Sequence, residues 1–364
     1  MNDRRNGLSR WKLAVMLLAM ALMLGPVMAG PKSQNKQDGG INPTNIAVIE
    51  SDLDDDLVAV NAEREDHCYE FLEFDDAADV EDHDQIGARD AHEIATGRGI
   101  WVAVLDAGFN LNHACIRENL APVEFDAIDG DYDAEDLGNG LDDDGDGMVD
   151  NAVGHGTFVA GMVLRAAPDA PIGPIRVMDD EGWGTNAELV RGIEFAIDLG
   201  VDVINLSIDQ PETKTTRLRK IIREALGSGI VVVIAAGNDG REQLSEIAEH
   251  PDMVVACASD DEDRRAPFSN FSTWSSCAQI FAPGVDLYGP VGCPFDDAMG
   301  RWSGTSFSAG ILSGAAALAR QCQPWLSTTD IRNLLADSVV PVRDLDGREM
   351  AGTGRIDLRL VVWR

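Results

Sequence analysis

The stretch Asn139–Gly161, NGLDDDGDGMVDNAVGHGTFVAG, places an acidic, glycine-spaced loop directly before the tripeptide His155-Gly-Thr. The run from Thr157 to Leu164 consists of apolar and small residues, so we expect a buried helix there. His155 then falls in the first turn of this helix. A lone histidine at a helix start usually has a structural role, so its meaning depends on which residues the rest of the chain brings to it.

Two other segments supply partners for this histidine. Asp106 directly follows the apolar segment Ile100–Leu105, which is typical of a parallel strand covered on both faces. Ser306 lies in Ser-Gly-Thr-Ser-Phe-Ser-Ala-Gly310 and opens a second helix of small residues. The order aspartate, histidine, serine is one of the three known chain orders of a Ser-His-Asp triad. We therefore expect a nucleophilic Ser306, with His155 as its base and Asp106 fixing the imidazole tautomer.

Taken together, these motifs make the chain resemble the subtilisin-like serine endopeptidases, or subtilases. The resemblance covers residues 85–360 and implies an α/β fold in three layers, a mostly parallel sheet between helices. It also implies that Asn238, in Ala-Ala-Gly-Asn, donates its side-chain amide to the oxyanion. The backbone N–H of Ser306 would be the second donor. Without the resemblance, an asparagine after a strand is simply a common turn former.

The resemblance further implies where a peptide substrate binds. Gly182-Trp183-Gly184 is similar to the family's edge segment, on which an extended peptide pairs as an added strand. Ser207-Ile208-Asp209 and Ala235-Ala236-Gly237 are similar to the two segments that wall the primary specificity pocket. Asp209 stands where the family usually has glycine. Its carboxylate either reaches a basic substrate side chain or points to solvent, as loop aspartates commonly do.

The remaining chain supports an α/β domain on its own pattern. Apolar, strand-like segments recur at residues 172–177, 201–206, 230–235 and 253–257. Helical patterns alternate with them, and one begins with the capping-box spacing of Thr185 and Glu188. Strands that alternate with helices imply a parallel sheet covered by helices. Ligands of such sheets bind at the carboxyl ends of the strands, where Asp106 is expected.

The acidic loop before His155 has the spacing of an oxygen-ligand calcium site. Asp142, Asp144, Asp146 and Gly147 occupy positions one, three, five and six of a calcium loop, and Asp150 occupies position nine. Position twelve is a valine instead of the usual glutamate, so the loop is not a complete EF-hand. We expect a structural calcium ion here; the alternative is a solvated acidic insertion.

The N-terminal part of the chain predicts export. Residues 1–29 combine basic residues, the apolar run Leu13–Leu24 and a cleavage site after Ala29, as in a secretory signal peptide. The apolar run is too short for a stable membrane anchor. The pair Arg4-Arg5 raises the alternative of a twin-arginine signal, although its flanks match poorly. We expect a secreted protein.

Residues 30–84 and 85–364 complete the expected organisation. The first segment is polar and then strongly acidic, and it forms either a short propeptide of a zymogen or a disordered spacer. The second is the catalytic domain. Export permits disulfides among an even number of cysteines, but the sequence cannot choose their pairing. The cysteines are Cys68, Cys115, Cys257, Cys277, Cys293 and Cys322.

Charge narrows the class of partners. The chain has 63 acidic and 29 basic residues, for a net charge of −34. Such a surface repels nucleic acid and anionic membranes. The resemblance implies protein or peptide substrates, and we expect a monomer. The predicted function is a secreted serine endopeptidase. Two alternatives remain: a homologue that binds peptides without turnover, and a cation-binding module in which the acidic loop is the functional element.

Overall fold

The computed structural model of the chain describes residues 57–59, 85–136, 138–145, 147–208, 216–273, 277–292 and 296–364. The chain divides into two units, residues 1–55 and 56–364, and everything described belongs to the second. The predicted signal peptide, residues 1–29, lies outside the described residues, and so does the segment 30–84 apart from residues 57–59. Asp146, Asp209, Cys68 and Cys293 also lie outside them.

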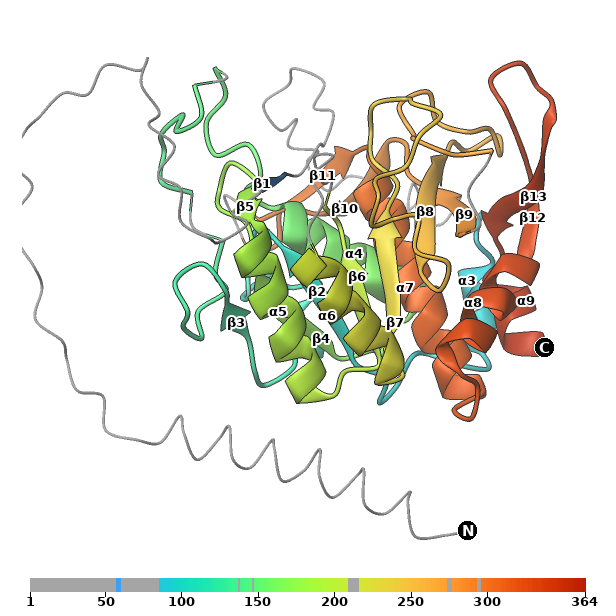
Figure 1. Cartoon of the computed structure of the whole chain (residues 1–364), viewed down its shortest axis with the longest axis horizontal. Helices are drawn as coiled ribbons and strands as arrows, with labels where there is room; N and C mark the ends of the chain where they lie inside the picture. The colour runs from blue at the N-terminus through green and yellow to red at the C-terminus, as the bar shows by residue number, and fades with distance from the viewer. Residues whose placement is uncertain are drawn as a thin grey trace, which may run out of the picture. The chain divides into compact units, whose positions relative to one another are not determined.

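A nine-stranded sheet runs through the described structure in the order β12-β13-β9-β8-β7-β6-β2-β4-β3 (Figure 1). Neighbouring strands from β13 to β3 pair in parallel, and only the edge pair β12 and β13 is antiparallel. The predicted mostly parallel sheet is therefore confirmed. The strands are β2 (Val102–Asp106), β3 (Phe125–Asp126), β4 (Ile172–Arg176), β6 (Val203–Leu206), β7 (Val231–Ala235), β8 (Val254–Ser259), β9 (Ala278–Pro283), β12 (Val339–Arg343) and β13 (Glu349–Ile356).

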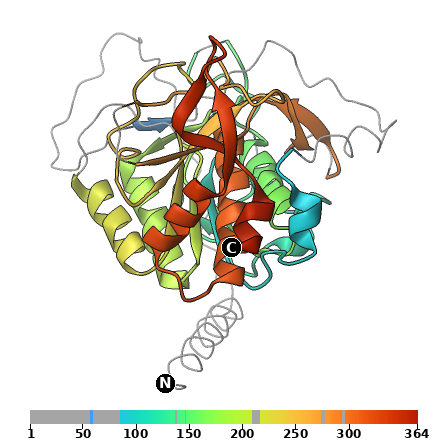
Figure 2. The same ribbon diagram turned by 90° about the vertical axis from the view of Figure 1, so that its right-hand side faces the viewer.

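Helices cover both faces of this sheet, because alternate side chains of each strand point to opposite layers. Val102 and Val104 of β2 share a core with α4 and α7, whereas Ala103 and Leu105 share one with α5 and α6. Figure 2 shows the two helical layers on either side of the sheet, so the predicted three-layer fold is confirmed. The helices are α3 (Ala88–His92), α4 (His155–Ala166), α5 (Asn186–Leu199), α6 (Thr216–Gly227), α7 (Thr305–Cys322), α8 (Thr328–Asp337) and α9 (Leu358–Trp363).

The helices α4 and α7 cross closely because glycines stand at the contact. A Cβ atom at Gly310 would lie 2.9 Å from the carbonyl oxygen of Val159, and one at Gly314 would lie 2.6 Å from that of Val163. Any larger residue at these two positions would push the helices apart. This crossing matters for the site because His155 begins α4 and Ser306 lies in the first turn of α7.

The local signals around α5 are confirmed. The side chain of Thr185 accepts a hydrogen bond from the Glu188 N–H, and the Glu188 carboxylate accepts one from the Thr185 N–H. These two bonds form the predicted capping box and satisfy N–H groups that have no partner within the helix. Gly200 ends the helix with a positive φ of 66°.

Two short antiparallel pairs and one 3-10 turn, η1 (Arg117–Asn119), lie outside the large sheet. Strand β10 (Leu287–Pro290) pairs with β11 (Met299–Trp302). Strand β1 (Leu57–Ala59) pairs with β5 (Trp183–Thr185), and the partners are Val58 with Gly184 and Ala59 with Trp183. Segments more than a hundred residues apart in the sequence thus form one ladder. The sequence predicted neither pair.

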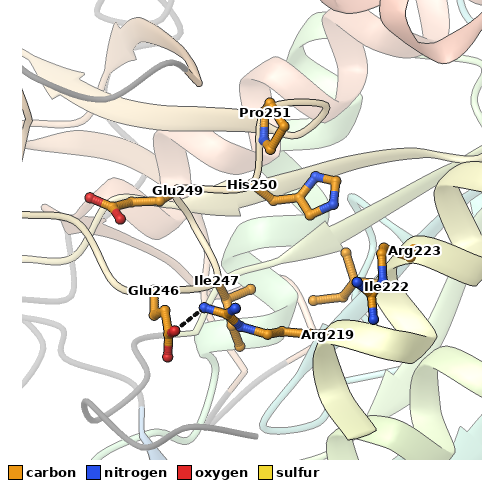
Figure 3. Close-up of a pocket in the computed structure, with 8 residues that line it drawn as sticks. All are labelled: Arg219, Ile222, Arg223, Glu246, Ile247, Glu249, His250 and Pro251. Carbon is orange, nitrogen blue, oxygen red and sulfur yellow. Dashed lines mark ion pairs between the residues drawn. The ribbon is translucent and has the colours of Figure 1, made fainter. Parts of the chain in front are cut away.

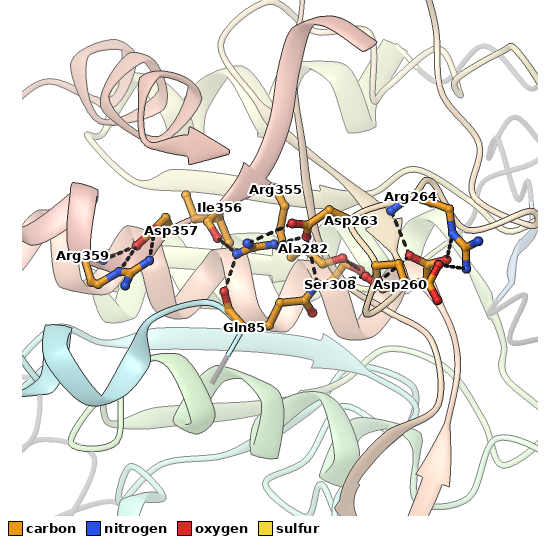
Figure 4. A network of polar contacts seen from close by, with 11 residues as sticks. Gln85, Asp260, Asp263, Arg264, Ala282, Ser308, Arg355, Ile356, Asp357 and Arg359 are labelled. Atoms are coloured by element: carbon orange, nitrogen blue, oxygen red, sulfur yellow. Dashed lines mark hydrogen bonds and ion pairs between the residues drawn. The ribbon is translucent and has the colours of Figure 1, made fainter. Parts of the chain in front are cut away.

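A polar network fixes the start of the domain to its C-terminal strand. Figure 4 shows Arg355 of β13 lying between Gln85 and Asp263. Its guanidinium donates to the Gln85 carbonyl oxygen at 2.5 Å and to an Asp263 carboxylate oxygen at 2.5 Å. The Gln85 amide nitrogen donates to the same carboxylate at 2.9 Å. The Leu358 N–H donates to the Ile86 carbonyl oxygen at 2.8 Å, so the chain is held from Gln85 onward.

Two further observations bear on the predicted export. None of the helices in the described part of the chain has both the length and the apolarity needed to cross a membrane. No disulfide joins the four cysteines that the structure describes, Cys115, Cys257, Cys277 and Cys322. The disulfide expectation therefore stays a prediction, since the other two cysteines lie outside the described residues.

Candidate active site

Asp106 and His155 meet at the carboxyl end of β2. Asp106 is the last residue of this central strand and His155 is the first of α4, and both side chains are fully buried. His155 Nδ1 lies 2.6 Å from Asp106 Oδ1, which also accepts the Ala107 N–H at 2.8 Å. A carboxylate can only accept hydrogen bonds, so Nδ1 carries the proton and Nε2 is left as the basic nitrogen.

Glycine permits this close approach. A Cβ atom at Gly156 would lie 2.2 Å from the carbonyl oxygen of Gly108 and 3.1 Å from the Asp106 Cβ. Residue 156 must therefore be glycine for α4 to lie against the segment that follows β2. This contact explains in physical terms why glycine follows the histidine in His155-Gly-Thr.

Aromatic rings enclose the imidazole of His155. The Trp302 ring lies 5.4 Å away at 89°, an edge-to-face arrangement, and the Phe307 ring lies 5.4 Å away at 42°. Phe158 packs against Phe307 with 4.4 Å between the ring centroids. Within the described residues, His155 Nε2 is buried and has no hydrogen-bond partner. The rings shield the imidazole from solvent.

Ser306 is held at the N-terminal turn of α7 through its backbone. The Ser207 hydroxyl donates to the Ser306 carbonyl oxygen at 3.1 Å and accepts from the Asn205 side-chain amide at 2.7 Å. The Ser313 hydroxyl donates to the Asn205 side-chain oxygen at 2.9 Å. All three side chains are fully buried, so the network ties β6 to the helix that carries Ser306. The sequence analysis did not identify Asn205 or Ser313.

Asn238 lies beside the start of the same helix, directly after β7. Its side-chain oxygen accepts the Thr305 N–H at 2.9 Å and the Thr305 hydroxyl at 3.0 Å. The Thr305 hydroxyl in turn accepts the Gly237 N–H at 3.2 Å. A Cβ atom at Gly304 would lie 3.9 Å from the Asn238 side-chain nitrogen, so this nitrogen faces the turn that precedes Ser306.

Two of the segments predicted to bind substrate lie at the carboxyl ends of strands, β6 and β7. Ser207 and Ile208 follow β6 and are buried. Ala235 ends β7, Ala236 and Gly237 follow it, and all three are buried. The Ser207 hydroxyl bonds to the Asn205 side chain and to the Ser306 backbone of α7. Only the Ser207 backbone is therefore left to line a pocket. Asp209, the third residue of that segment, is not among the described residues.

Gly182, Trp183 and Gly184 lie at and within β5. A Cβ atom at Gly184 would lie 2.2 Å from the Val177 carbonyl oxygen, so glycine lets β5 approach the chain that follows β4. The Trp183 side chain is 39% exposed, and its indole N–H donates to an Asp144 carboxylate oxygen at 2.9 Å. This bond joins the edge strand to the acidic loop.

The acidic loop is held mainly by its own backbone N–H groups. The Asp142 carboxylate accepts from Gly145 and Gly147, and the Asp150 carboxylate accepts from residues 139 and 140. Glu181 accepts from residues 143, 150 and 151, a role that the sequence analysis missed. Among the residues that the structure describes, no three His, Cys, Asp or Glu side chains are grouped to hold a metal ion. Asp146, one of the four predicted ligands, is not among the described residues.

A cavity of about 250 Å³ lies elsewhere, between α6 and the segment that leads to β8 (Figure 3). Arg219, Arg223 and His250 line it together with Glu246, which forms an ion pair with Arg219. None of the predicted site residues contributes to this cavity.

The fold, with Asp106 and His155 paired at the carboxyl end of β2, is that of the subtilisin-like proteins. The model of the subtilase family matches residues 97–354. The chain therefore belongs to the subtilase family of serine endopeptidases.

Individual relatives agree with this assignment. The chain is 34% identical to a thermophilic serine proteinase of Bacillus sp. (strain AK1) over 230 residues, which are 60% of this chain and 52% of that protein. It is 34% identical to subtilisin DY of Bacillus licheniformis over 203 residues, 52% of this chain and 72% of that protein. The chain thus spans about half the length of the first relative.

Solved structures show the same fold. A protease of Pseudoalteromonas arctica PAMC 21717 superposes with a TM-score of 0.67 at 26% identity, over 76% of this chain and 93% of that chain. A cold-adapted subtilisin-like serine proteinase superposes with a TM-score of 0.59 at 25% identity, over 70% of this chain and 88% of that chain.

Proposed function

We propose that this chain is a secreted endopeptidase that hydrolyses peptide bonds through Asp106, His155 and Ser306. The observation that carries the proposal is the buried hydrogen bond between Asp106 and His155 Nδ1 at 2.6 Å. It fixes the tautomer in which Nε2 is basic, and Nε2 has no other partner within the described residues. A homologue that only binds peptides would have no need of this arrangement.

In the proposed mechanism, Ser306 Oγ attacks the carbonyl carbon of the scissile bond while its proton passes to His155 Nε2. The C–N bond of the substrate then breaks, and His155 Nε2 returns the proton to the leaving amine. An acyl-enzyme remains until water, deprotonated by Nε2, attacks the ester and releases the acid. Asp106 stabilises the imidazolium that forms in each half of the reaction.

We assign the binding of the oxyanion to two donors, the Asn238 side-chain amide and the Ser306 N–H. The two hydrogen bonds from Thr305 to the Asn238 oxygen support this assignment, because they orient the amide nitrogen toward the turn before Ser306. Donors fixed in advance need no reorganisation when charge develops in the transition state. The substrate chain would lie between Gly182–Gly184 on one side and the segments that end β6 and β7 on the other.

A fluorophosphonate probe tests the proposed function. Ser308→Ala is a matched control on the same helix, because the Ser308 hydroxyl is buried and donates to the carbonyl oxygens of residues 282 and 283. Wild type and Ser308→Ala should be labelled, and Ser306→Ala should not. Labelling of Ser306→Ala would exclude it as the nucleophile, and an unlabelled wild type that binds peptides would support the non-catalytic alternative.

We also propose that part of residues 30–84 acts as an inhibitory propeptide and that the catalytic domain begins at Gln85. Strand β1 pairs with β5, on the edge where the family resemblance places the substrate. A strand already paired there excludes an incoming peptide. The Arg355 contacts to Gln85 and Asp263 support the boundary, because they would persist after cleavage upstream.

A proline in β1 tests the inhibitory role. Proline has no N–H to donate to the ladder, so Val58→Pro should weaken the pairing with Gly184. The full-length variant should hydrolyse a small peptide ester from the first measurement, whereas the full-length wild type should show a lag that ends when the N-terminal segment is cleaved. Equal time courses for the two chains would contradict the role of β1.

Calcium remains part of the proposal as a structural ion. The carboxylates of Asp142, Asp144, Asp146 and Asp150 have the hard oxygen donors that calcium prefers, and Gly145 and Gly147 have positive φ angles that let a loop turn tightly. When bound, the ion would neutralise several like charges. Through the Asp144 bond to Trp183, the loop is also connected to the proposed substrate edge.

A further inference from the structure

One buried carboxylate near the triad has no role in the mechanism above. Asp136 is only 9% exposed, and its N–H donates to the Phe109 carbonyl oxygen at 3.0 Å. The Phe109 N–H donates to the Ala134 carbonyl oxygen at 2.9 Å. These bonds fasten Asp136 to the chain three residues beyond Asp106.

The same carboxylate contacts the other triad segment. Asp136 Oδ2 accepts the Gly154 N–H at 2.5 Å, and Gly154 directly precedes His155. Gly154 has a φ of 90°, and no side chain caps the start of α4 from the N-cap position. An anionic acceptor at this end of the helix therefore supplies the negative charge that the helix N-terminus favours. Asp136 thus joins the segment after Asp106 to the residue before His155.

Glycines lie close around this side chain. A Cβ atom at Gly108 would lie 3.1 Å from the Asp136 Cα and Cβ atoms. One at Gly292 would lie 2.6 Å from the Gly154 Cα and 3.4 Å from Asp136 Oδ2. Three glycines, Gly108, Gly154 and Gly292, therefore bring backbone close to Asp136, and its carboxylate accepts the N–H of one of them, Gly154.

The charges that face Asp136 come from several elements. Burial raises the pKa of Asp136 to about 7, while the Gly154 N–H and Arg176 of β4 oppose this shift. Asp106 of β2 and Asp180, which follows β4, raise the pKa further by repulsion. Helix α4 contributes His155 in its first turn, whose ring binds Asp106. Asp136 therefore changes its charge in the pH range in which a histidine base also titrates.

We propose that Asp136 is a positioning residue for the catalytic pair: its ionised carboxylate holds Gly154 and so aligns His155 with Asp106. This inference rests on the proposed protease mechanism. Protonation would replace a charge-assisted acceptor by a weaker neutral one and loosen the start of α4. Asp136 itself touches neither the substrate nor the reacting atoms.

Kinetics of Asp136→Asn and Asp136→Ala test the proposal. The asparagine keeps the shape and one acceptor oxygen, whereas the alanine removes the acceptor. Asp133→Asn is the control, since Asp133 is exposed on the same segment. Each protein is titrated with a fluorophosphonate, so that rates refer to competent sites, and kcat and KM for a small peptide ester are measured from pH 5 to pH 9, an interval of roughly two units on either side of a histidine pKa.

In the wild type and the control, log kcat/KM should fall just below neutrality with a slope steeper than 1, because protonation of Asp136 lowers activity in the same range in which protonation of the catalytic base abolishes it. In Asp136→Asn the slope should be about 1. Asp136→Ala should lose about tenfold or more in kcat with little change in KM, and Asp136→Asn should recover part of that loss. Recovery by the conservative variant separates positioning from general destabilisation.

A slope of about 1 in all four proteins, or equal kcat in the wild type and both Asp136 variants, would overturn the proposal. If Asp136→Ala does not fold, the pH dependence of log kcat/KM in Asp136→Asn still tests the proposal. A wild type that neither reacts with the fluorophosphonate nor hydrolyses the ester would refute the proposed protease function instead, so the two failures are distinguishable.

Discussion

Replacing Asp136 by asparagine should change the stability of the protein in a strongly pH-dependent way. The pKa of Asp136 is raised from 3.8 to about 7, chiefly by burial, so the folded protein binds this proton more tightly than the unfolded chain does. Stability from the bound proton is complete below pH 4 and is lost as the pH rises toward 7. A shift of about 3 pKa units corresponds to about 4 kcal/mol.

The asparagine side chain does not titrate in this range. The free energy of unfolding of Asp136→Asn relative to wild type should therefore increase by about 4 kcal/mol between pH 4 and pH 8. The favourable interaction of the carboxylate with the start of α4, at most about 2 kcal/mol, is smaller and already opposes the shift. The variant should consequently be more stable than wild type at pH 8.

Urea unfolding at a series of pH values measures this difference. All chains carry Ser306→Ala to prevent autolysis, and the exposed Asp261→Asn serves as a matched loss of one carboxylate. The midpoint and slope give the free energy of unfolding at each pH. The measured quantity is the difference in the free energy of unfolding between Asp136→Asn and its parent. The reasoning would be refuted if this difference did not vary with pH, or varied as little as it does for the control.

Three further predictions concern the rest of the site. Thr305→Val keeps the side-chain shape but removes the hydroxyl that donates to Asn238, so kcat should fall about tenfold with KM unchanged; unchanged kcat would contradict the orienting role. Removing calcium with a chelator should lower Tm and speed autolysis by loosening the acidic loop, and chelation without effect on either would exclude a structural ion there. If Asp209 reaches a basic substrate side chain, a peptide library varied before the scissile bond should show a lysine or arginine preference that Asp209→Gly abolishes, whereas the same apolar preference in both would exclude that role.

The sequence was sufficient to predict those elements whose structure depends on a local residue pattern. The central strands were predicted within two residues, because continuous apolar segments such as Val102–Asp106 are long enough to identify buried parallel strands. The capping box of α5 and the glycine that ends it follow from local hydrogen bonding alone. The positions of Asp106 and His155 were predicted in the same way, one at a strand end and the other at a helix start.

Contacts between distant segments could not be predicted. Asp136 follows a run of acidic residues and looks like part of a solvated loop, and only the packing of the segments around Gly108, Gly154 and Gly292 buries it. The pairing of β1 with β5 joins residues more than a hundred positions apart, and a three-residue strand carries too little pattern to be recognised. Ser207 was predicted as a pocket residue, but no local signal shows that its hydroxyl binds the Ser306 backbone.

The buried carboxylates at this edge of the sheet suggest why an unfavourable charge is tolerated. Burial disfavours the ionised carboxylate of Asp136, and repulsion by Asp106 and Asp180 adds to the cost. In the proposed mechanism, His155 is positively charged only while a proton is in transit, so the attraction of these carboxylates is stronger in the transition state than in the ground state. Interactions of this kind raise kcat. Asp136→Asn should therefore move two properties in opposite directions at pH 8, toward greater stability and slower turnover. A residue whose role is only structural would lower both when replaced.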